Sequence, residues 1–215
     1  MDYTFNTSHL TCAVPVTLSG ATWSNLVSAG CPQAILSLAS GMNETSINSL
    51  YQKLGFFKTP NLPLPVAQAK ASPDVTVLND YILGQEGLSV TPLQMALAAA
   101  ALSNQGLRPA PRLAMAIDTS QQGWVILPST QPPSQALPAS QVASATQLLS
   151  AAAAPIWESL GSAQNGPGKV VTWYIGGTLP AWKGAPIAVA VVLEENNPAL
   201  AQAIGQSLIE TTPTP

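Results

Sequence analysis

The chain has 215 residues, which is enough for one domain with a sizeable core or for two small ones. Only 8% of the residues are charged and 47% are hydrophobic, so neutral polar side chains must supply most of the wetted surface. Seven Lys and Arg and ten Asp and Glu residues are scattered without runs, which excludes an electrostatic pattern for nucleic acid or anionic lipid. No apolar run reaches the roughly 20 residues needed to cross a bilayer, and Met1–Tyr3 is not the start of a signal peptide.

The first third of the chain predicts short helices joined by loops. Capping residues and apolar spacing favour helices over residues 22–27, 32–40 and 43–54. The proline-rich segment 58–73 predicts an ordered, extended loop. The pattern of residues 74–83 is ambiguous.

The clearest predicted element is a helix over residues 92–104. Thr91 suits the N-cap, and Pro92 stands at the first helical position, where its missing N–H costs nothing. Gln94 stands where a capping box requires it. An Ala and Leu run follows, and Gly106 suits the left-handed conformation that ends a helix. These features predict a short, well-capped, buried helix.

The chain then changes character. Residues 112–118 and 124–127 predict two strands joined by a polar turn. Residues 128–138 are of low complexity and predict a mobile connector. An alanine-rich helix over residues 139–154 follows.

The last part predicts two strands and a closing helix. The strands cover residues 170–176 and 187–193, and the second is apolar on both faces, as in a central strand covered on each side. Residues 198–210 predict the last helix, and 211–215 a loose tail.

The order of these elements indicates an α/β (α+β) domain. Helices followed by strands and a closing helix favour a mostly antiparallel sheet flanked by helices. We expect a single domain over residues 1–210, with a mainly helical part over 1–110 and the sheet with its helix over 111–210.

Several segments carry motifs in the order found in one family. Gly84–Leu113 reads GQEGLSVTPLQMALAAAALSNQGLRPAPRL and resembles the transpeptidase domain of high-molecular-weight penicillin-binding proteins. Weaker motifs agree in order and spacing. Val171–Gly176 resembles that family's A-W-F-x-G strand, Ile187–Glu194 its next strand, Ala199–Ile209 its C-terminal helix, Ala21–Leu38 its segment ending in S-C-N, and Leu54–Phe56 its L-G-F-G.

The resemblance implies a definite catalytic apparatus. In that family the motifs S-x-x-K, S-x-N and K-T-G surround one cleft. The serine attacks a carbonyl, and a lysine one helical turn away takes its proton. The S-x-N side chains relay protons, while the K-T-G strand binds a carboxylate and frames the oxyanion hole. The family's serine helix and first strands precede the segments matched here, so we expect an N-terminally truncated domain that lacks them.

The catalytic motifs are missing from this chain. None of the five lysines has a serine three residues before it, so S-x-x-K does not occur. At the S-x-N position the chain reads Gly30-Cys31-Pro32. Where K-T-G-T belongs it reads Ser159-Leu160-Gly161-Ser162, and no K-T-G or K-S-G occurs in any register. Ser46-Ile47-Asn48 matches S-x-N in letters, but it lies inside a predicted helix.

Two losses at separate positions favour a catalytically inactive, transpeptidase-like domain with a scaffold or partner role in bacterial peptidoglycan synthesis. The resemblance implies that the domain lies outside the cytoplasmic membrane and is anchored by an upstream segment.

The expected partners of the domain are cell-wall synthesis proteins or wall peptide, with no cofactor and no nucleic acid. A homodimer through a sheet edge that the missing strands leave bare is also expected. Two alternatives remain: an active, divergent D,D-transpeptidase with its S-x-x-K upstream, and a non-catalytic module that binds wall peptides.

Other reactive residues carry weaker signals. Cys12 and Cys31 are either two buried thiols or, in the oxidising compartment that the resemblance implies, a disulfide. His9 is the chain's one histidine and has no nearby ligand cluster, so no metal site is expected. Glu194-Glu195 is interpreted as a solvated strand end.

Overall fold

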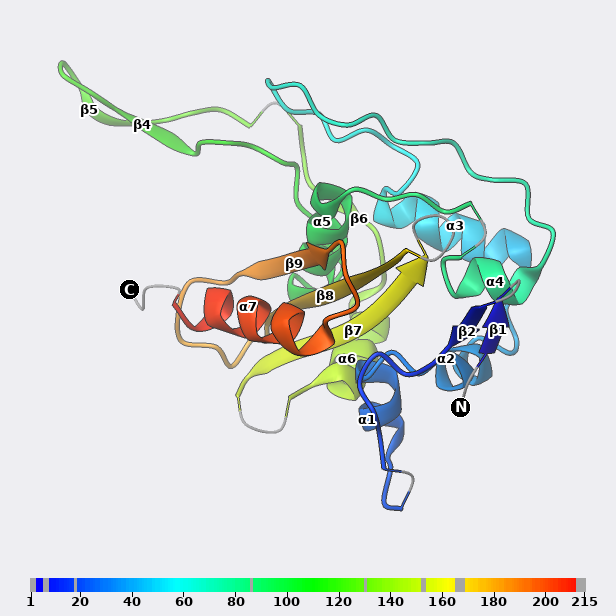
Figure 1. The fold of residues 1–215 in the computed structure, drawn as a ribbon. Helices are drawn as coiled ribbons and strands as arrows, with labels where there is room; N and C mark the ends of the chain where they lie inside the picture. Colours follow the sequence, from blue (N-terminus) through cyan, green and yellow to red (C-terminus); the bar gives the residue numbers. More distant parts are fainter. Residues whose placement is uncertain are drawn as a thin grey trace.

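A three-stranded antiparallel sheet forms the centre of the molecule (Figure 1). The computed structural model describes residues 3–5, 8–17, 19–85, 87–129, 131–151, 154–164 and 169–211. The sheet has the order β7-β8-β9, with both neighbouring pairs antiparallel. Its strands are β7 (Ile156–Gln164), β8 (Val170–Thr178) and β9 (Ala188–Leu193).

Helices cover both faces of this sheet. α7 (Pro198–Glu210) packs on one face, where Leu160 and Tyr174 meet Ala201. α5 (Pro92–Ser103) packs on the other, where the Trp157 indole donates a hydrogen bond to the Ser103 hydroxyl at 2.9 Å. The predicted mixed helix and antiparallel-sheet fold is therefore confirmed.

The position of β9 differs from the prediction of a central strand. Within the described sheet β8 is central and β9 lies at the edge. β9 is nevertheless apolar on both faces because α5 and α7 each pack against it. The continuous apolar run of β9 therefore indicates that both of its faces are covered, and it does not require a central position in the sheet.

The predicted helices of the first half are confirmed, and their bounds agree closely with the structure. α5 has the complete capping box, in which Thr91 and Gln94 each bond to the other's backbone. The ambiguous segment 74–83 contains a short helix, and a hairpin that the sequence did not predict precedes the helices. The elements are β1 (Tyr3–Phe5), β2 (Ser8–Leu10), α1 (Trp23–Ser28), α2 (Pro32–Leu38), α3 (Glu44–Leu54) and α4 (Leu78–Ile82).

Between α5 and the sheet lie two short ladders and one helix. β4 (Ala116–Thr119) and β5 (Gly123–Ile126) form the predicted hairpin, which stands away from the rest of the molecule in Figure 1. The segment predicted as a mobile connector contains β6 (Ser134–Gln135), which pairs with β3 (Leu107–Arg108). Backbone pairing with the chain that follows α5 gives this low-complexity stretch a regular element. α6 (Ala139–Leu149) is the predicted alanine-rich helix.

Two motifs of the sequence meet at Gln94. Its side chain is 1% exposed, and its amide nitrogen lies 3.2 and 2.7 Å from the carbonyl oxygens of Gly55 and Phe56. Gly55 has a left-handed φ of +88° and ends α3 as predicted. Arg108 Nη1 donates to Leu54 O at 3.2 Å, in the space that a side chain at Gly55 would fill. The T-P-L-Q and L-G-F segments are thus held together by a buried amide.

A tyrosine cluster beside this junction predicts sensitivity to alkaline pH. Burial raises the pKa of Tyr51, and the nearby Tyr81 raises it further. The Tyr51 hydroxyl donates to the carbonyl oxygens of Tyr81 and Ile82 at 3.0 and 3.2 Å. The folded state therefore keeps a proton that the unfolded chain loses near its ordinary pKa of about 10, so this stability is present below that pH and is lost above it.

We expect the urea midpoint to fall as the pH rises above about 10, with tyrosinate absorbance appearing together with unfolding. In Tyr51→Phe the same pH series should give a shallower fall. A midpoint that falls equally in both proteins would show that Tyr51 is not the responsible group.

Among the described residues, no helix has both the length and the apolar character required to cross a membrane.

Candidate functional site

The two segments predicted to be degenerate S-x-N and K-T-G motifs, Gly30–Pro32 and Ser159–Ser162, lie directly against each other. Gly30 follows α1 with a φ of +64°, a conformation that side chains rarely adopt. A Cβ at Gly30 would overlap the carbonyl oxygen of Leu160 in β7 and would lie 3.2 Å from Gly161 Cα. The loop between α1 and α2 therefore touches the outer edge of β7 through backbone atoms, and this approach requires glycine.

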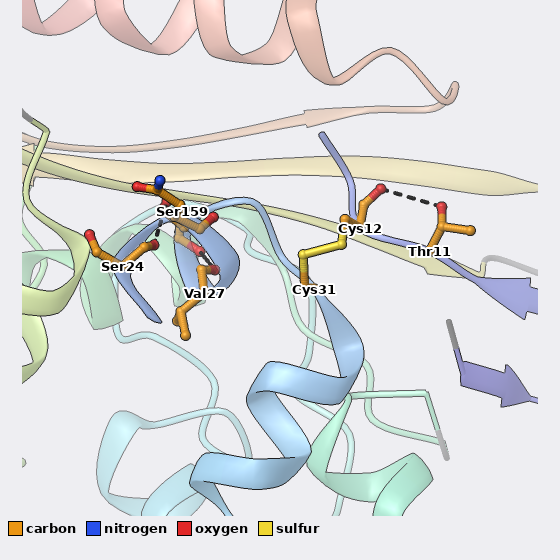
Figure 2. Close-up of a disulfide and its surroundings, with 8 residues drawn as sticks. Thr11, Cys12, Ser24, Val27, Cys31 and Ser159 are labelled. Carbon is orange, nitrogen blue, oxygen red and sulfur yellow. Dashed lines mark hydrogen bonds between the residues drawn. A yellow bond between two sulfur atoms is a disulfide. The ribbon is translucent and has the colours of Figure 1, made fainter. Parts of the chain in front are cut away.

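The contacts of Cys31 and Pro32 stabilise the fold. The Cys31 side chain is fully buried and forms a disulfide with Cys12, 19 positions earlier (Figure 2). Its N–H donates to Leu26 O at 2.9 Å. Pro32 is buried and begins α2, where no backbone N–H is needed. Neither residue supplies the hydroxyl or amide of an S-x-N motif.

The disulfide closes a short loop around a small apolar cluster. Cys31 packs with Leu26, Ala29 and Ala34, and Cys12 lies at the edge of that cluster. Ala13 N donates to Ala29 O at 2.9 Å beside the bridge. The disulfide thus ties the N-terminal segment to the loop that carries Gly30.

Removing this bridge is expected to lower the free energy of unfolding by about 3 kcal/mol, because the unfolded chain gains freedom. The variant is Cys12→Ala/Cys31→Ala, compared with the oxidised parent by urea denaturation. The intact non-reduced parent should also be two hydrogens lighter than the reduced protein. Equal masses would show that both thiols are free.

The four residues at the predicted K-T-G-T position, Ser159–Ser162, lie in β7, and their side chains alternate between its two faces. Leu160 is buried against α7 with Tyr174 and Ala201. Ser159 Oγ lies 3.5 Å from Val27 O of α1, as Figure 2 shows. Ser162 O accepts from the Gln85 amide at 3.4 Å. These residues hold α1 and the segment after α4 against the sheet. None of the four is a lysine or an arginine, so they supply no positive charge.

Two cavities flank this junction. One of about 500 Å³ lies on the α5 side, lined by Gly161, Ser162, Trp173 and Met95 among others. A second of about 470 Å³ lies near α1 and α7, and Glu158 and Leu160 are in its wall. Gly30, Cys31 and Pro32 line neither. The ionisable side chain in the first wall is Glu194 and in the second Glu158, so the described linings of both contain no lysine or histidine to serve as a base.

Glu158 belongs to a polar group that no motif or spacing in the sequence predicts. Its carboxylate accepts hydrogen bonds from the amides of Gln202 at 2.9 Å and Gln206 at 3.0 Å, both on α7. Tyr174 is fully buried nearby, and burial raises its pKa, with the charge of Glu158 raising it further. A Cβ at Gly205 of α7 would overlap the Tyr174 ring. This group lies on the α7 face of the sheet and holds that helix in place.

The remaining candidates from the sequence are structural or solvated. Ser46-Ile47-Asn48 lies in α3, where Ser46 N–H bonds to the Asn43 cap at 2.9 Å. Glu194 and Glu195 are exposed after β9. The described residues contain no group of three or more side chains suited to a metal, and the side chain of His9 lies outside them.

The comparisons with known proteins identify the family. Residues 21–210 match the penicillin binding protein transpeptidase domain model, so the chain belongs to that family. It is a transpeptidase-like domain of the kind found in peptidoglycan synthesis proteins, and such domains typically lie outside the cytoplasmic membrane. A search of curated proteins finds no match.

Solved structures show the same fold. Penicillin-binding protein A from M. tuberculosis, in an imipenem acyl-enzyme complex, is 25% identical with a TM-score of 0.69 over 95% of this chain and 51% of its own. The D,D-transpeptidase domain of a peptidoglycan glycosyltransferase from Eggerthella lenta is 16% identical, with a TM-score of 0.70 over 97% of this chain and 58% of its own. A peptidoglycan glycosyltransferase from Burkholderia ambifaria is 15% identical, with a TM-score of 0.66 over 99% and 71%. The chain thus spans about half the length of the first of these.

Proposed function

We propose that this chain is a catalytically inactive transpeptidase-like domain that acts as a scaffold or partner in peptidoglycan synthesis, outside the cytoplasmic membrane. The observation that carries this proposal is the backbone contact of Gly30 with Leu160. In the family these two segments supply the serine, asparagine and lysine that face the substrate across a cleft. Here they supply glycine, a disulfide-bonded cysteine, proline and leucine, and they touch.

Chemistry at this position would need groups that the chain does not place there. Acyl transfer needs a nucleophile beside a base, with a further group to orient the base. The hydroxyl of Ser159, next to Leu160 in the chain, donates to the carbonyl oxygen of Val27, which is not a base. A carboxylate-bearing substrate would also meet no lysine in the linings of the two adjacent cavities.

The test is the intact mass of the protein before and after incubation with a penicillin. We expect no adduct, because the 215 residues contain no S-x-x-K, the pair that activates a serine to open the β-lactam ring. Penicillin-treated protein with the mass of one added penicillin would overturn the proposal and would identify its nucleophile by peptide mapping. A known penicillin-binding transpeptidase, treated in parallel, is the positive control.

The second candidate is an active, divergent D,D-transpeptidase. It is favoured by the 25% identity to a penicillin-binding protein that forms an acyl-enzyme with imipenem. This candidate requires an S-x-x-K outside these 215 residues and a cleft that works without the S-x-N and K-T-G residues. The same mass measurement on any longer natural form of the protein separates the two candidates, since acylation of that form would establish an enzyme.

A scaffold role further predicts a protein partner or wall peptide. Saturable binding of a soluble muropeptide without a change in protein mass would indicate the non-catalytic wall-peptide module. Binding to cell-wall synthesis proteins without affinity for muropeptide would favour the scaffold.

A further inference from the structure

The β4–β5 hairpin exposes a large amount of apolar surface. Within it Ile117, Trp124 and Ile126 are 45%, 74% and 80% exposed, and in the chain leading into β4 Leu113 and Met115 are 59% and 67% exposed. The hairpin extends away from the sheet and its helices in Figure 1, so the fold itself does not cover these side chains. The register places Trp124 and Ile126 on one face of the hairpin and Ile117 on the other, so both faces expose large apolar side chains. Exposed apolar surface beyond single scattered side chains marks interaction sites.

The outer edge of β4 is also open for pairing. Ile117 pairs with Val125, and Leu127 N donates to Met115 O at 2.9 Å, so the odd-numbered residues direct their backbone groups toward β5. The N–H and C=O groups of Ala116 and Asp118 therefore point to the other side, where the described sheet has no further strand. An open edge of this kind is a template for another strand.

The sequence along this edge is nearly symmetric about Met115. It reads Arg112-Leu113-Ala114-Met115-Ala116-Ile117-Asp118. We propose that a second copy of this chain pairs along this segment in antiparallel fashion, with the two-fold axis at Met115. Arg112 then lies opposite Asp118 of the second copy, Leu113 opposite its Ile117, and Ala114 opposite its Ala116.

The register of this pairing agrees with the backbone. Arg112, Ala114, Ala116 and Asp118 are the even-numbered residues, whose groups face the open edge once the strand is extended. In this register each even-numbered residue lies opposite an even-numbered residue of the second copy, so their backbone groups can form hydrogen bonds. Met115 meets its own copy at a position without hydrogen bonds, where opposed side chains come closest. β4 begins at Ala116 and the backbone bends at Leu113 and Met115, so dimerisation extends the strand back to Arg112.

The charged residues of this segment favour a second copy of the chain over a lipid surface as the partner. Arg112 and Asp118 are both exposed and are the charged residues of this segment. In the dimer each carboxylate faces a guanidinium, and the pairing occurs twice. Hydrocarbon would leave the edge N–H and C=O groups unpaired and would bury the Asp118 charge. A second copy supplies a partner for each of these groups.

This pairing uses none of the residues of the degenerate cleft. Ser159–Ser162 belong to β7 and Gly30 contacts that strand, and β7 lies away from the β4–β5 hairpin in Figure 1. The interface and the proposed inactivity are therefore independent, and either can fail without the other.

The first experiment is sedimentation velocity over a concentration range from about 1 µM to 1 mM. The parent is expected to show a monomer–dimer equilibrium. Arg112→Asp and Asp118→Arg each place like charges opposite each other twice, and each should weaken the dimer about tenfold or more. The double variant Arg112→Asp/Asp118→Arg restores opposite charges and should regain the dimer. Leu38→Lys, which adds a charge at an exposed site on α2, should leave the equilibrium unchanged.

The second experiment fixes the axis by a covalent bond. Both native cysteines are in the disulfide, so a new cysteine stands alone. Met115→Cys should form a disulfide-linked dimer under mild oxidation. Ser120→Cys, at the tip of the same hairpin, should not. Thermal melts of all variants show whether they are folded.

Three results would overturn the proposal. The parent could sediment as a monomer at every concentration. The dimer could persist unchanged in both single charge variants, which would place it on another surface such as the β9 edge. The parent could remain monomeric and bind vesicles of phosphatidylcholine and phosphatidylglycerol, with Met115→Lys abolishing binding, which would assign the hairpin to lipid.

Discussion

Gly30→Ala is expected to lower the free energy of unfolding by roughly 3 kcal/mol. About 1–2 kcal/mol comes from forcing a side-chain-bearing residue into the left-handed region, since Gly30 has a φ of +64°. The rest comes from the overlap of the new Cβ with Leu160 O, which the strand edge cannot relieve without moving. Urea denaturation of the oxidised protein is the measurement.

Two other glycines separate these contributions. Gly20 has a φ of +82° with open space around its Cβ position, so Gly20→Ala should cost only the backbone term of about 1 kcal/mol. Gly41 has neither a positive φ nor a close neighbour, so Gly41→Ala should stay within about 0.5 kcal/mol of the parent. If Gly30→Ala costs no more than Gly20→Ala, the loop does not press on β7, and the contact on which the proposed inactivity rests is refuted.

The contact at Gly30 also bears on function. Gly30→Ser/Pro32→Asn would restore the letters of S-x-N, yet the serine would begin with the same overlap on Leu160. We expect this variant to be less stable than the parent and still not to react with penicillin. If the proposed inactivity holds, the backbone path at Gly30 contributes to it as well as the missing side chains.

Gln94→Met is expected to cost about 2–4 kcal/mol, because a buried amide is removed while its partners stay buried. The carbonyl oxygens of Gly55 and Phe56 lose their donor, and the backbone N–H of Thr91 loses its acceptor, Gln94 Oε1. Methionine has a similar volume and good helix propensity, so packing and propensity change little.

The matched control is Thr91→Ala. It removes the hydroxyl that accepts from Gln94 N at 3.2 Å but leaves the buried amide in place. Its cost should be near 1 kcal/mol, the usual value of an N-cap. Equal losses in the two variants would show that Gln94 acts as a helix cap alone and does not join α5 to the Gly55 segment.

Local signals predicted the helices well. The cap at Thr91, the left-handed Gly55 after α3 and the proline that begins α7 are decided by a few neighbouring residues. Such choices depend on backbone groups that have no partner at a helix end, and these are satisfied within one turn. The sequence therefore contained enough information to place these elements.

β7 shows the opposite case. Ile156–Gln164 contains Glu158, Gly161 and two serines, so it lacks a clear alternation of apolar and polar residues and was not predicted as a strand. It is a strand because β8 pairs with it along its whole length, from Ile156 opposite Thr178 to Gln164 opposite Val170. The family resemblance pointed to this segment as the K-T-G position, but the pairing that makes it a strand is tertiary.

The sequence by itself determined the family motifs, the boundaries of the capped helices and the identity of the residues at the predicted S-x-N and K-T-G positions. These depend on residue identity and on neighbours within a few positions. Only the tertiary structure decided that Gly30 touches Leu160, that Glu158 is held by Gln202 and Gln206, and that β9 lies at the edge of the described sheet. Each of these joins residues tens of positions apart or depends on which strands become neighbours, and no local pattern specifies contacts of that range.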